Sequence, residues 1–199
     1  MTSPASDGSQ KYELAHVFAM FRRVEKVMKT VETVCGEFPA PALNEIRMAF
    51  YHVILAVEDD SAAGDVESAL KHCKRAYYDA REIEVLAELE IIMDFERACS
   101  GHEDIVKANI RDYADKRKAV LKARDALNDA ALTHSTRDEL FDKYDQPCQT
   151  LRAYCAEISA MQPAISTAIR KQKIKFLFQC LGALAALSTI IGLVLRLFF

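Results

Sequence analysis

The sequence lacks tryptophan and contains only six glycines and five prolines among its 199 residues. Glycine and proline are the residues that most often interrupt helices, whereas the abundant alanine, leucine, glutamate, lysine and arginine favour them. No segment alternates apolar and polar residues in the way that a half-buried strand does. This composition argues against a β-rich fold and predicts an all-α protein.

The sequence also lacks the motifs that mark common catalytic and phosphate-binding folds. It has no glycine-rich phosphate loop, no G-x-S-x-G segment and no H-E-x-x-H segment. Cys73 follows His72 directly, but consecutive side chains of a helix point in different directions and form no catalytic dyad. We therefore expect no catalytic residue and a protein that is not an enzyme.

The spacing of the candidate ligands disfavours metal and cofactor sites. The six cysteines include no Cys-x-x-Cys pair, and a reducing cytosol would keep them as small buried thiols. A di-iron site in a helical bundle needs two Glu-x-x-His motifs, and only Glu13 and His16 make one. We expect no metal and no cofactor. The acidic run from Glu82 to Glu96 should be solvated or paired with the basic residues of the next helix.

Charge and the first residues exclude further classes. The formal net charge is −3, so bulk electrostatics gives no reason to expect a DNA or RNA partner. The first ten residues, MTSPASDGSQ, have neither the basic start nor the apolar run of a signal peptide, and no lipidation motif is present. Their composition predicts a disordered N-terminus over residues 1–10.

What the sequence does contain is one long apolar run near its end. The twenty residues from Phe176 to Leu195 include no charged residue, which is the length a helix needs to cross a hydrocarbon core of about 30 Å. Basic residues prefer the cytosolic side of a span, where they also meet anionic lipid. Four precede the run: Arg170, Lys171, Lys173 and Lys175. We expect a basic juxtamembrane stalk over residues 163–175, a transmembrane helix over 176–199, and a single-pass, tail-anchored protein with its N-terminal part in the cytosol.

Apolar residues at alternating steps of three and four predict about five antiparallel helices in a cytosolic bundle over residues 11–162. In the second helix this spacing favours a buried face of Leu43, Ile46, Phe50, Val53 and Val57. Pro147 should kink the fifth helix, and Pro163 should restart the chain. The five ranges are Lys11–Cys35, Ala42–Glu58, Val66–Cys99, Glu103–Leu132 and 136–161.

The predicted membrane helix carries its polar and small residues on one face. At about 100° per residue they form a stripe roughly a quarter turn wide. Small residues allow helices to approach closely, and polar residues bond across helices or face water. This polar stripe predicts a helix oligomer, with or without a pore. The alternative is an inert anchor that tolerates a few polar groups. Its members are Gln179, Gly182, Ala186, Thr189, Leu193 and Arg196.

A second candidate site lies on the hairpin of the second and third helices. His52 and His72 stand at equal distances from the turn between Asp59 and Asp65, so they should lie at similar height. Arg47 and Asp79 are also at comparable heights and could pair. A group of Arg, Lys, His and Tyr could hold a phosphate or nucleotide. The alternative is a solvated helix face with local ion pairs.

The same hairpin carries a residue pattern found in other proteins. The segments IRMAFYHVILAVEDD and VESALKHCKRAYYDA place Arg47, Ala49 and His52 before Ala69, His72, Arg75, Ala76 and Asp79. This pattern resembles the membrane effectors of bacterial antiphage systems, including the Hailong type. The resemblance implies a nucleotide-derived signal bound by the cytosolic part, ion conduction by the membrane part, and the bacterial inner membrane as its location. It makes Arg47, His52, His72 and Arg75 the candidate ligand-binding residues.

Two hypotheses of different classes follow. In the first, a cytosolic sensor binds a signal or regulatory protein and controls the assembly or opening of an oligomeric channel of transmembrane helices, causing membrane depolarisation. Any pore must then come from several subunits, since the chain has one span. In the second, the protein is a tail-anchored adaptor or tether that recruits a partner to a membrane through its helical stripes. In a eukaryote the same tail would suit the endoplasmic reticulum or the mitochondrial outer membrane.

Overall fold

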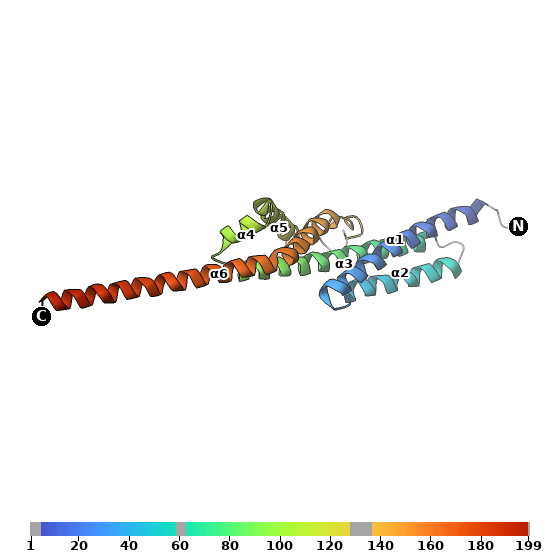
Figure 1. Ribbon diagram of the computed structural model, residues 1–199. Coiled ribbons are helices and arrows are strands. Elements are labelled where there is room, and N and C mark those ends of the chain that lie inside the picture. Colours follow the sequence, from blue (N-terminus) through green and yellow to red (C-terminus); the bar gives the residue numbers. More distant parts are fainter. Residues whose placement is uncertain (1–4, 59–62, 128–136, 199) are drawn as a thin grey trace. The chain divides into compact units, whose positions relative to one another are not determined.

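The computed structural model describes residues 5–58, 63–127 and 137–198, without the side chains of residues 5–13, 63, 126, 194 and 196–198. Over these residues the chain has six helices and no strand (Figure 1). This architecture confirms the predicted all-α fold. The helices are α1 (Ala5–Cys35), α2 (Ala40–Glu58), α3 (Ala63–Ala98), α4 (Glu103–Asn109), α5 (Tyr113–Leu127) and α6 (Asp145–Phe198).

The chain divides into two compact units. Unit 1 comprises Met1–Met93 and Ala114–Cys155, and unit 2 comprises Asp94–Tyr113 and Ala156–Phe199. Both α3 and α6 therefore begin in unit 1 and continue into unit 2. Helix α1 begins at Ala5, so its first turns occupy part of the segment that was expected to be disordered.

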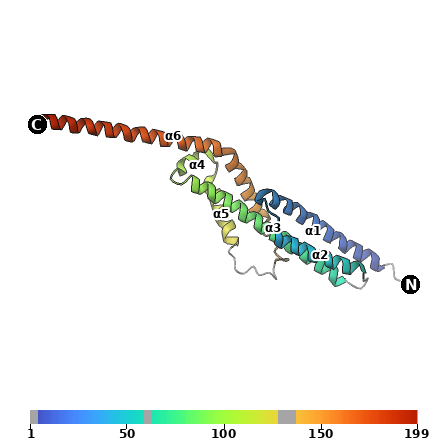
Figure 2. The same ribbon diagram turned by 90° about the horizontal axis from the view of Figure 1, so that it is seen from below.

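The core of unit 1 lies between α1, α2 and α3, which run side by side in Figures 1 and 2. Helix α1 contributes a row of valines and methionines, among them Val17, Val24 and Val31. Helix α3 contributes mainly small residues, including Ala69, Cys73 and Ala76. Burying such side chains is the main favourable contribution to the stability of a bundle.

Helix α2 buries only part of its predicted face: Ile46 and Val53 pack inward, whereas Leu43, Phe50 and Val57 do not. Its buried residues are Ala42, Ile46, Ala49 and Ala56, with Val53 partly buried. Four larger side chains, which we call the outer stripe of α2, are instead about half exposed or more: Leu43, Phe50, Ile54 and Val57. Each residue of the outer stripe directly follows a residue of the inward-facing row in the sequence, so both rows have the same helical spacing. The row with more alanine packs inward because small side chains let neighbouring helices approach closely.

The predicted fourth helix is interrupted. It consists of α4 and α5, separated by Ile110–Asp112. Ile110 adopts an extended conformation at the end of α4, and Asp112 has a positive φ of 53°. Ile110 is almost fully buried at this break, so the turn of the chain places an apolar side chain in the interior of unit 2. Residues 128–132, the end of the predicted helix, lie outside the described residues.

The two prolines in the last third of the chain do not act as predicted. Pro147 is the third residue of α6. In the first turn of a helix the backbone N–H groups have no acceptor within the helix, so a proline there removes no hydrogen bond and does not kink the helix. Pro163 lies inside α6 and does not restart the chain. The expected stalk at residues 163–175 is consequently part of one helix of 54 residues that begins in unit 1.

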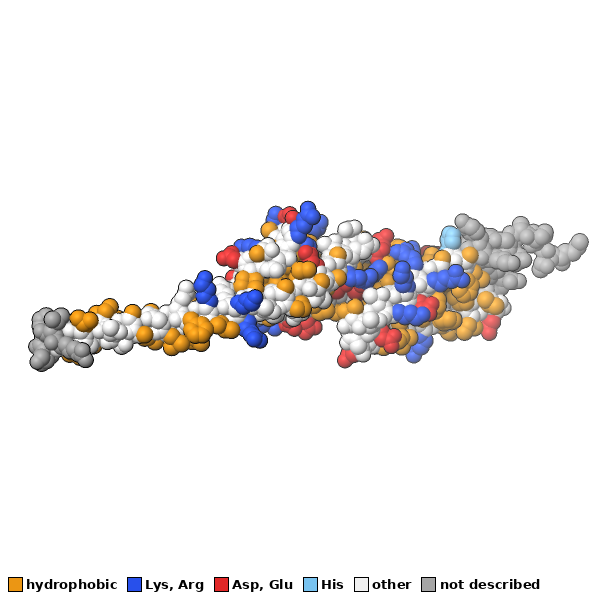
Figure 3. All heavy atoms as spheres, in the orientation of Figure 1, with side chains coloured by type: hydrophobic (Ala, Val, Ile, Leu, Met, Phe, Trp, Pro, Cys, Tyr) orange, Lys and Arg blue, Asp and Glu red, His pale blue; other side chains and the backbone are white. Residues whose placement is uncertain are grey.

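Unit 2 joins the end of α3 and helix α4 to the second part of α6. Its buried side chains include Phe95 from α3, Cys99 directly after that helix, Val106 from α4, and Ile165 and Ile169 from α6. Beyond Ile169, every described side chain of α6 is exposed except the half-buried Cys180. Figure 3 shows basic side chains followed by hydrophobic and neutral ones along this part of the helix. In length and composition it is apolar enough to cross a membrane, as predicted.

Candidate functional site

The two histidines of the α2–α3 hairpin meet as predicted. Their rings stack with centroids 5.3 Å apart and planes inclined by 16°. Each Nδ1 contacts a carboxylate: that of His52 lies 2.8 Å from Asp65, and that of His72 lies 2.6 Å from Glu45. Both rings are mostly buried. An anion entering beside the rings would face these two carboxylates, which oppose its binding.

The two arginines assigned to the same site lie elsewhere. Arg47 is exposed and donates to Asn44 on its own helix, 2.9 Å away. It does not pair with Asp79, which forms a close ion pair with Arg137 at 2.5 Å. Arg75 faces Asp138 at 3.6 Å. The structure thus brings together only the histidines, and the ligand-binding role of the four residues stays a prediction.

A more substantial polar site lies between α3 and the start of α6, within unit 1. Arg81 donates from Nε to Asp145 at 3.0 Å and from Nη1 to Glu84 at 2.7 Å. Tyr77 donates its hydroxyl to the same oxygen of Asp145 at 2.6 Å. The Glu84 side chain is completely buried. We call this group the buried ion network; its members are Tyr77, Arg81, Glu84, Glu88, Asp145 and Arg152.

Arg152 of α6 completes the network. Its guanidinium pairs closely with Glu84, and its Nε lies 3.6 Å from a carboxylate oxygen of Glu88. The prediction that the acidic run is solvated or paired with the following helix is therefore wrong for Glu84 and Glu88, which face α6. Burial raises the pKa of Glu88 to about 8, although the charge of Arg81 opposes the shift. Neither oxygen of Glu88 has a hydrogen bond in the described part of the chain, which fits a neutral acid.

Glu88 makes stability depend on pH. Because its pKa is about 8 in the folded state and near 4.5 ordinarily, the folded state holds a proton that the unfolded state has lost between these values. The free energy of unfolding should therefore fall as pH rises through this window, by at most about 1.4 kcal/mol per pH unit. Thermal unfolding of the full-length protein in detergent should show a flatter dependence in Glu88→Gln. Glu90→Gln, at an exposed position of the same helix, is the matched control; equal slopes in wild type and Glu88→Gln would contradict the assignment.

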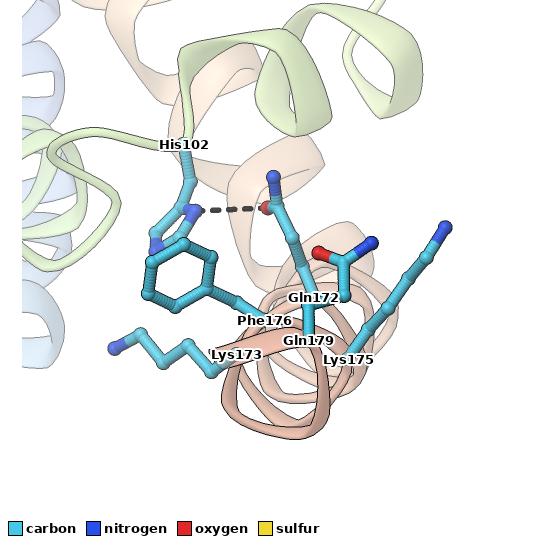
Figure 4. Close-up of a pocket in the computed structure, with 6 residues that line it drawn as sticks. All are labelled: His102, Gln172, Lys173, Lys175, Phe176 and Gln179. Atoms are coloured by element: carbon cyan, nitrogen blue, oxygen red, sulfur yellow. Dashed lines mark hydrogen bonds between the residues drawn. The ribbon is translucent and has the colours of Figure 1, made fainter. Parts of the chain in front are cut away.

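A second polar site lies in unit 2, where α6 leaves the packed part of that unit. A recess of about 380 Å³ is lined by His102, Gln172, Lys173, Lys175, Phe176 and Gln179 (Figure 4). His102, which precedes α4, has its Nδ1 3.0 Å from Oε1 of Gln172. We call this the basic recess. Two of the four predicted membrane-surface residues line it; Arg170 lines a neighbouring recess, and Lys171 is exposed beside both.

The polar stripe is uncovered in the single chain. Gln179 lines the basic recess, and Gly182, Ala186 and Leu193 are exposed. A Cβ added at Gly182 would meet no atom within 4 Å, so a neighbouring helix has room there. The hydroxyl of Thr189 donates to the carbonyl of Ala185 at 2.9 Å, which reduces the cost of placing it in an apolar medium. The side chain of Arg196 lies outside the described residues.

The cysteines are buried or half-buried thiols. Within the described residues, no group of three or more His, Cys, Asp or Glu side chains is placed to hold a metal ion. All six cysteines are free thiols. Burial raises the pKa of Cys73, Cys148 and Cys155 to about 12, so these thiols stay protonated and unreactive near neutral pH.

Sequence reasoning missed the buried ion network for an identifiable reason. Glu84 and Glu88 are four residues apart, and Cys148, Arg152 and Cys155 follow one another on α6 at steps of four and three. That pattern could have indicated an acidic row facing a row with one arginine.

No protein-family model, curated protein or solved structure matches this chain.

Proposed function

We propose that this chain is a single-pass membrane protein whose helical unit 1 controls the assembly of its membrane helices. The apolar part of α6 would cross the bilayer, and unit 1 would lie in the cytosol. Exposure of the apolar side chains supports insertion, because a water-soluble protein rarely leaves so long an apolar surface uncovered. The four basic residues before it support the orientation.

One observation carries the proposal: α6 is continuous from the buried ion network into the apolar segment. The same helix packs Cys148, Leu151 and Tyr154 in unit 1 and presents the polar stripe further on. A buried network of charges has few acceptable arrangements, since a partly satisfied one is costly. A signal that favours one packing of α3 against α6 would shift the population of the form that assembles.

The finer proposal is that the assembled helices conduct ions. Polar groups on a membrane helix are unfavourable against lipid and favourable against protein or water, which supports a shared or water-lined face. Depolarisation in antiphage defence, and the bacterial inner membrane as its location, rest on the residue pattern around Arg47 and Asp79 and stay predictions. A pore then needs several copies of the chain, each contributing one helix.

Replacing residues 176–199 with an unrelated single-pass anchor of equal length tests this function. If the polar stripe assembles the protein, the chimera should insert into the membrane and lose at least about tenfold in oligomer yield, because its helices lack a complementary face. Chemical cross-linking in native membranes measures the yield. A chimera that assembles as well as the wild type would show that the tail only anchors.

The alternative is a membrane-anchored adaptor, and the outer stripe of α2 favours it. Leu43, Phe50, Ile54 and Val57 repeat at steps of seven, four and three and are 48% to 67% exposed. Phe50 also meets Phe21 of α1 edge-on, with centroids 5.6 Å apart. An exposed row of this kind is a surface onto which a partner helix can pack. In this alternative, the chimera with the unrelated anchor should keep its activity.

A further inference from the structure

The basic recess combines two lysines, two amides, an imidazole and one aromatic ring. Gln172, Phe176 and Gln179 share one face of α6, and Lys173 and Lys175 flank that face on either side. Figure 4 shows the ring of His102 above Phe176, with its bond to the amide of Gln172. None of the six lining residues is acidic. The recess therefore offers amide N–H donors with a flexible lysine on either side of them.

The donors suit a phosphate group. A carbonyl oxygen accepts hydrogen bonds, so Nδ1 of His102 donates to Oε1 of Gln172 and the amide nitrogen of Gln172 keeps its own donors for a ligand. The amide of Gln179 offers a second donor group about two turns further along. Lysine ammonium groups bind phosphate as point charges, and charge-assisted bonds of this kind are the stronger ones.

The place of the recess along the chain identifies the source of the phosphate. Phe176 and Gln179 belong to the apolar run, whereas Lys173 and Lys175 directly precede it. In a membrane-inserted helix this is the level of the lipid headgroups, where aromatic rings and lysines gather. We propose that the basic recess binds the phosphate of an anionic phospholipid headgroup, with the amide of Gln172, held in place by His102, as a positioned donor. The inference rests on the proposed membrane insertion.

A specific site differs from a generally basic surface in two testable ways. General attraction to an anionic membrane depends on charge alone, so the neighbouring Lys171 should matter as much as the lysines of the recess. Neutral donors should then not matter. A built site requires the opposite: Lys171 is outside the recess and dispensable, whereas the uncharged Gln172 contributes.

The experiment titrates full-length protein in a zwitterionic detergent with short-chain phosphatidylglycerol, and native mass spectrometry counts the bound lipid. Lys173→Ala/Lys175→Ala should weaken binding at least about tenfold, and Gln172→Ala at least about threefold, because each removes a hydrogen bond to a charged group. Lys171→Ala should stay within about twofold of the wild type. Far-UV circular dichroism verifies that each variant keeps its helix content.

Two further arms separate the remaining outcomes. Short-chain phosphatidylcholine should bind at least about tenfold more weakly, and inorganic phosphate should not displace phosphatidylglycerol at equal concentration. Displacement by phosphate would overturn the lipid source, and an equal loss in Lys171→Ala or none in Gln172→Ala would overturn the site. Alkaline carbonate extraction of membranes tests insertion by itself. A released protein would defeat the proposed function, whereas an inserted protein without headgroup selectivity would defeat only this inference.

Discussion

Replacing Arg81 with alanine should destabilise the protein by about 3–5 kcal/mol, the range seen when one partner of a buried ion pair is removed. Arg81 is the residue that neutralises Glu84, whose side chain is fully buried, and it also binds Asp145 and Tyr77. Without it, Glu84 keeps Arg152 as its one ion-pair partner among the described residues, and Arg152 is half exposed. Since whole domains are stable by about 5–15 kcal/mol, such a loss should lower the thermal midpoint clearly. Circular dichroism of the full-length protein in detergent measures it.

Arg97→Ala is the matched control for this prediction. Arg97 donates to Asp94 at 2.7 Å, three residues away on the same helix, as Arg81 donates to Glu84 at 2.7 Å. The pair of Arg97 is exposed, at 73% and 61%, so its loss should change stability by less than about 1 kcal/mol. If the two variants lose similar stability, the buried ion network does not stabilise the contact between α3 and α6.

The double variant Gln179→Leu/Thr189→Leu should abolish conductance and assembly while insertion is retained or improved. Both positions lie in the polar stripe, and leucine removes their polar groups while increasing the apolar character of the span. Conductance of the purified protein in planar bilayers, together with cross-linking in membranes, measures the two effects.

Ser188→Leu is the control for the double variant. Ser188 lies outside the stripe, about 100° around the helix from Thr189, yet its hydroxyl donates to the same carbonyl of Ala185 as that of Thr189, at 2.8 Å and 2.9 Å. The change in hydropathy is similar to that of the Thr189→Leu substitution, and the two positions differ in the face they occupy. Unchanged conductance in Gln179→Leu/Thr189→Leu, or an equal loss in Ser188→Leu, would contradict the role of the stripe.

The elements of this fold could be predicted where one face alone was apolar. The row of valines and methionines on α1 can face only the core, and it does so in the structure. The uncharged run of α6 likewise forms the long apolar helix segment that its composition indicates. In α2 two adjacent rows were apolar, so spacing could not show that Ala49 rather than Phe50 faces the core. Whether Pro147 and Pro163 interrupt a helix depends on where that helix begins. The position of a proline in the sequence does not show that α6 begins at Asp145.

The sites were less predictable because they depend on contacts between distant residues. Counting from the turn placed His52 beside His72 correctly. It could not show that Nδ1 of each imidazole contacts a carboxylate, that of Asp65 or that of Glu45. Nor could it show that Arg75 faces Asp138. Similarly, an acidic row on α3 is solvated or buried according to what packs on it, and Arg152 follows Glu84 only after 68 residues of chain.

The most direct test of the account is the subunit number of the full-length protein in native nanodiscs, measured beside a version that ends at Lys175. We expect a closed assembly of four or more copies for the full-length protein and a lower number for the shortened one, since the polar stripe is lost with residues 176–199. A monomer or dimer in both versions would leave no room for a shared helix face, and the controlled assembly of membrane helices would be refuted.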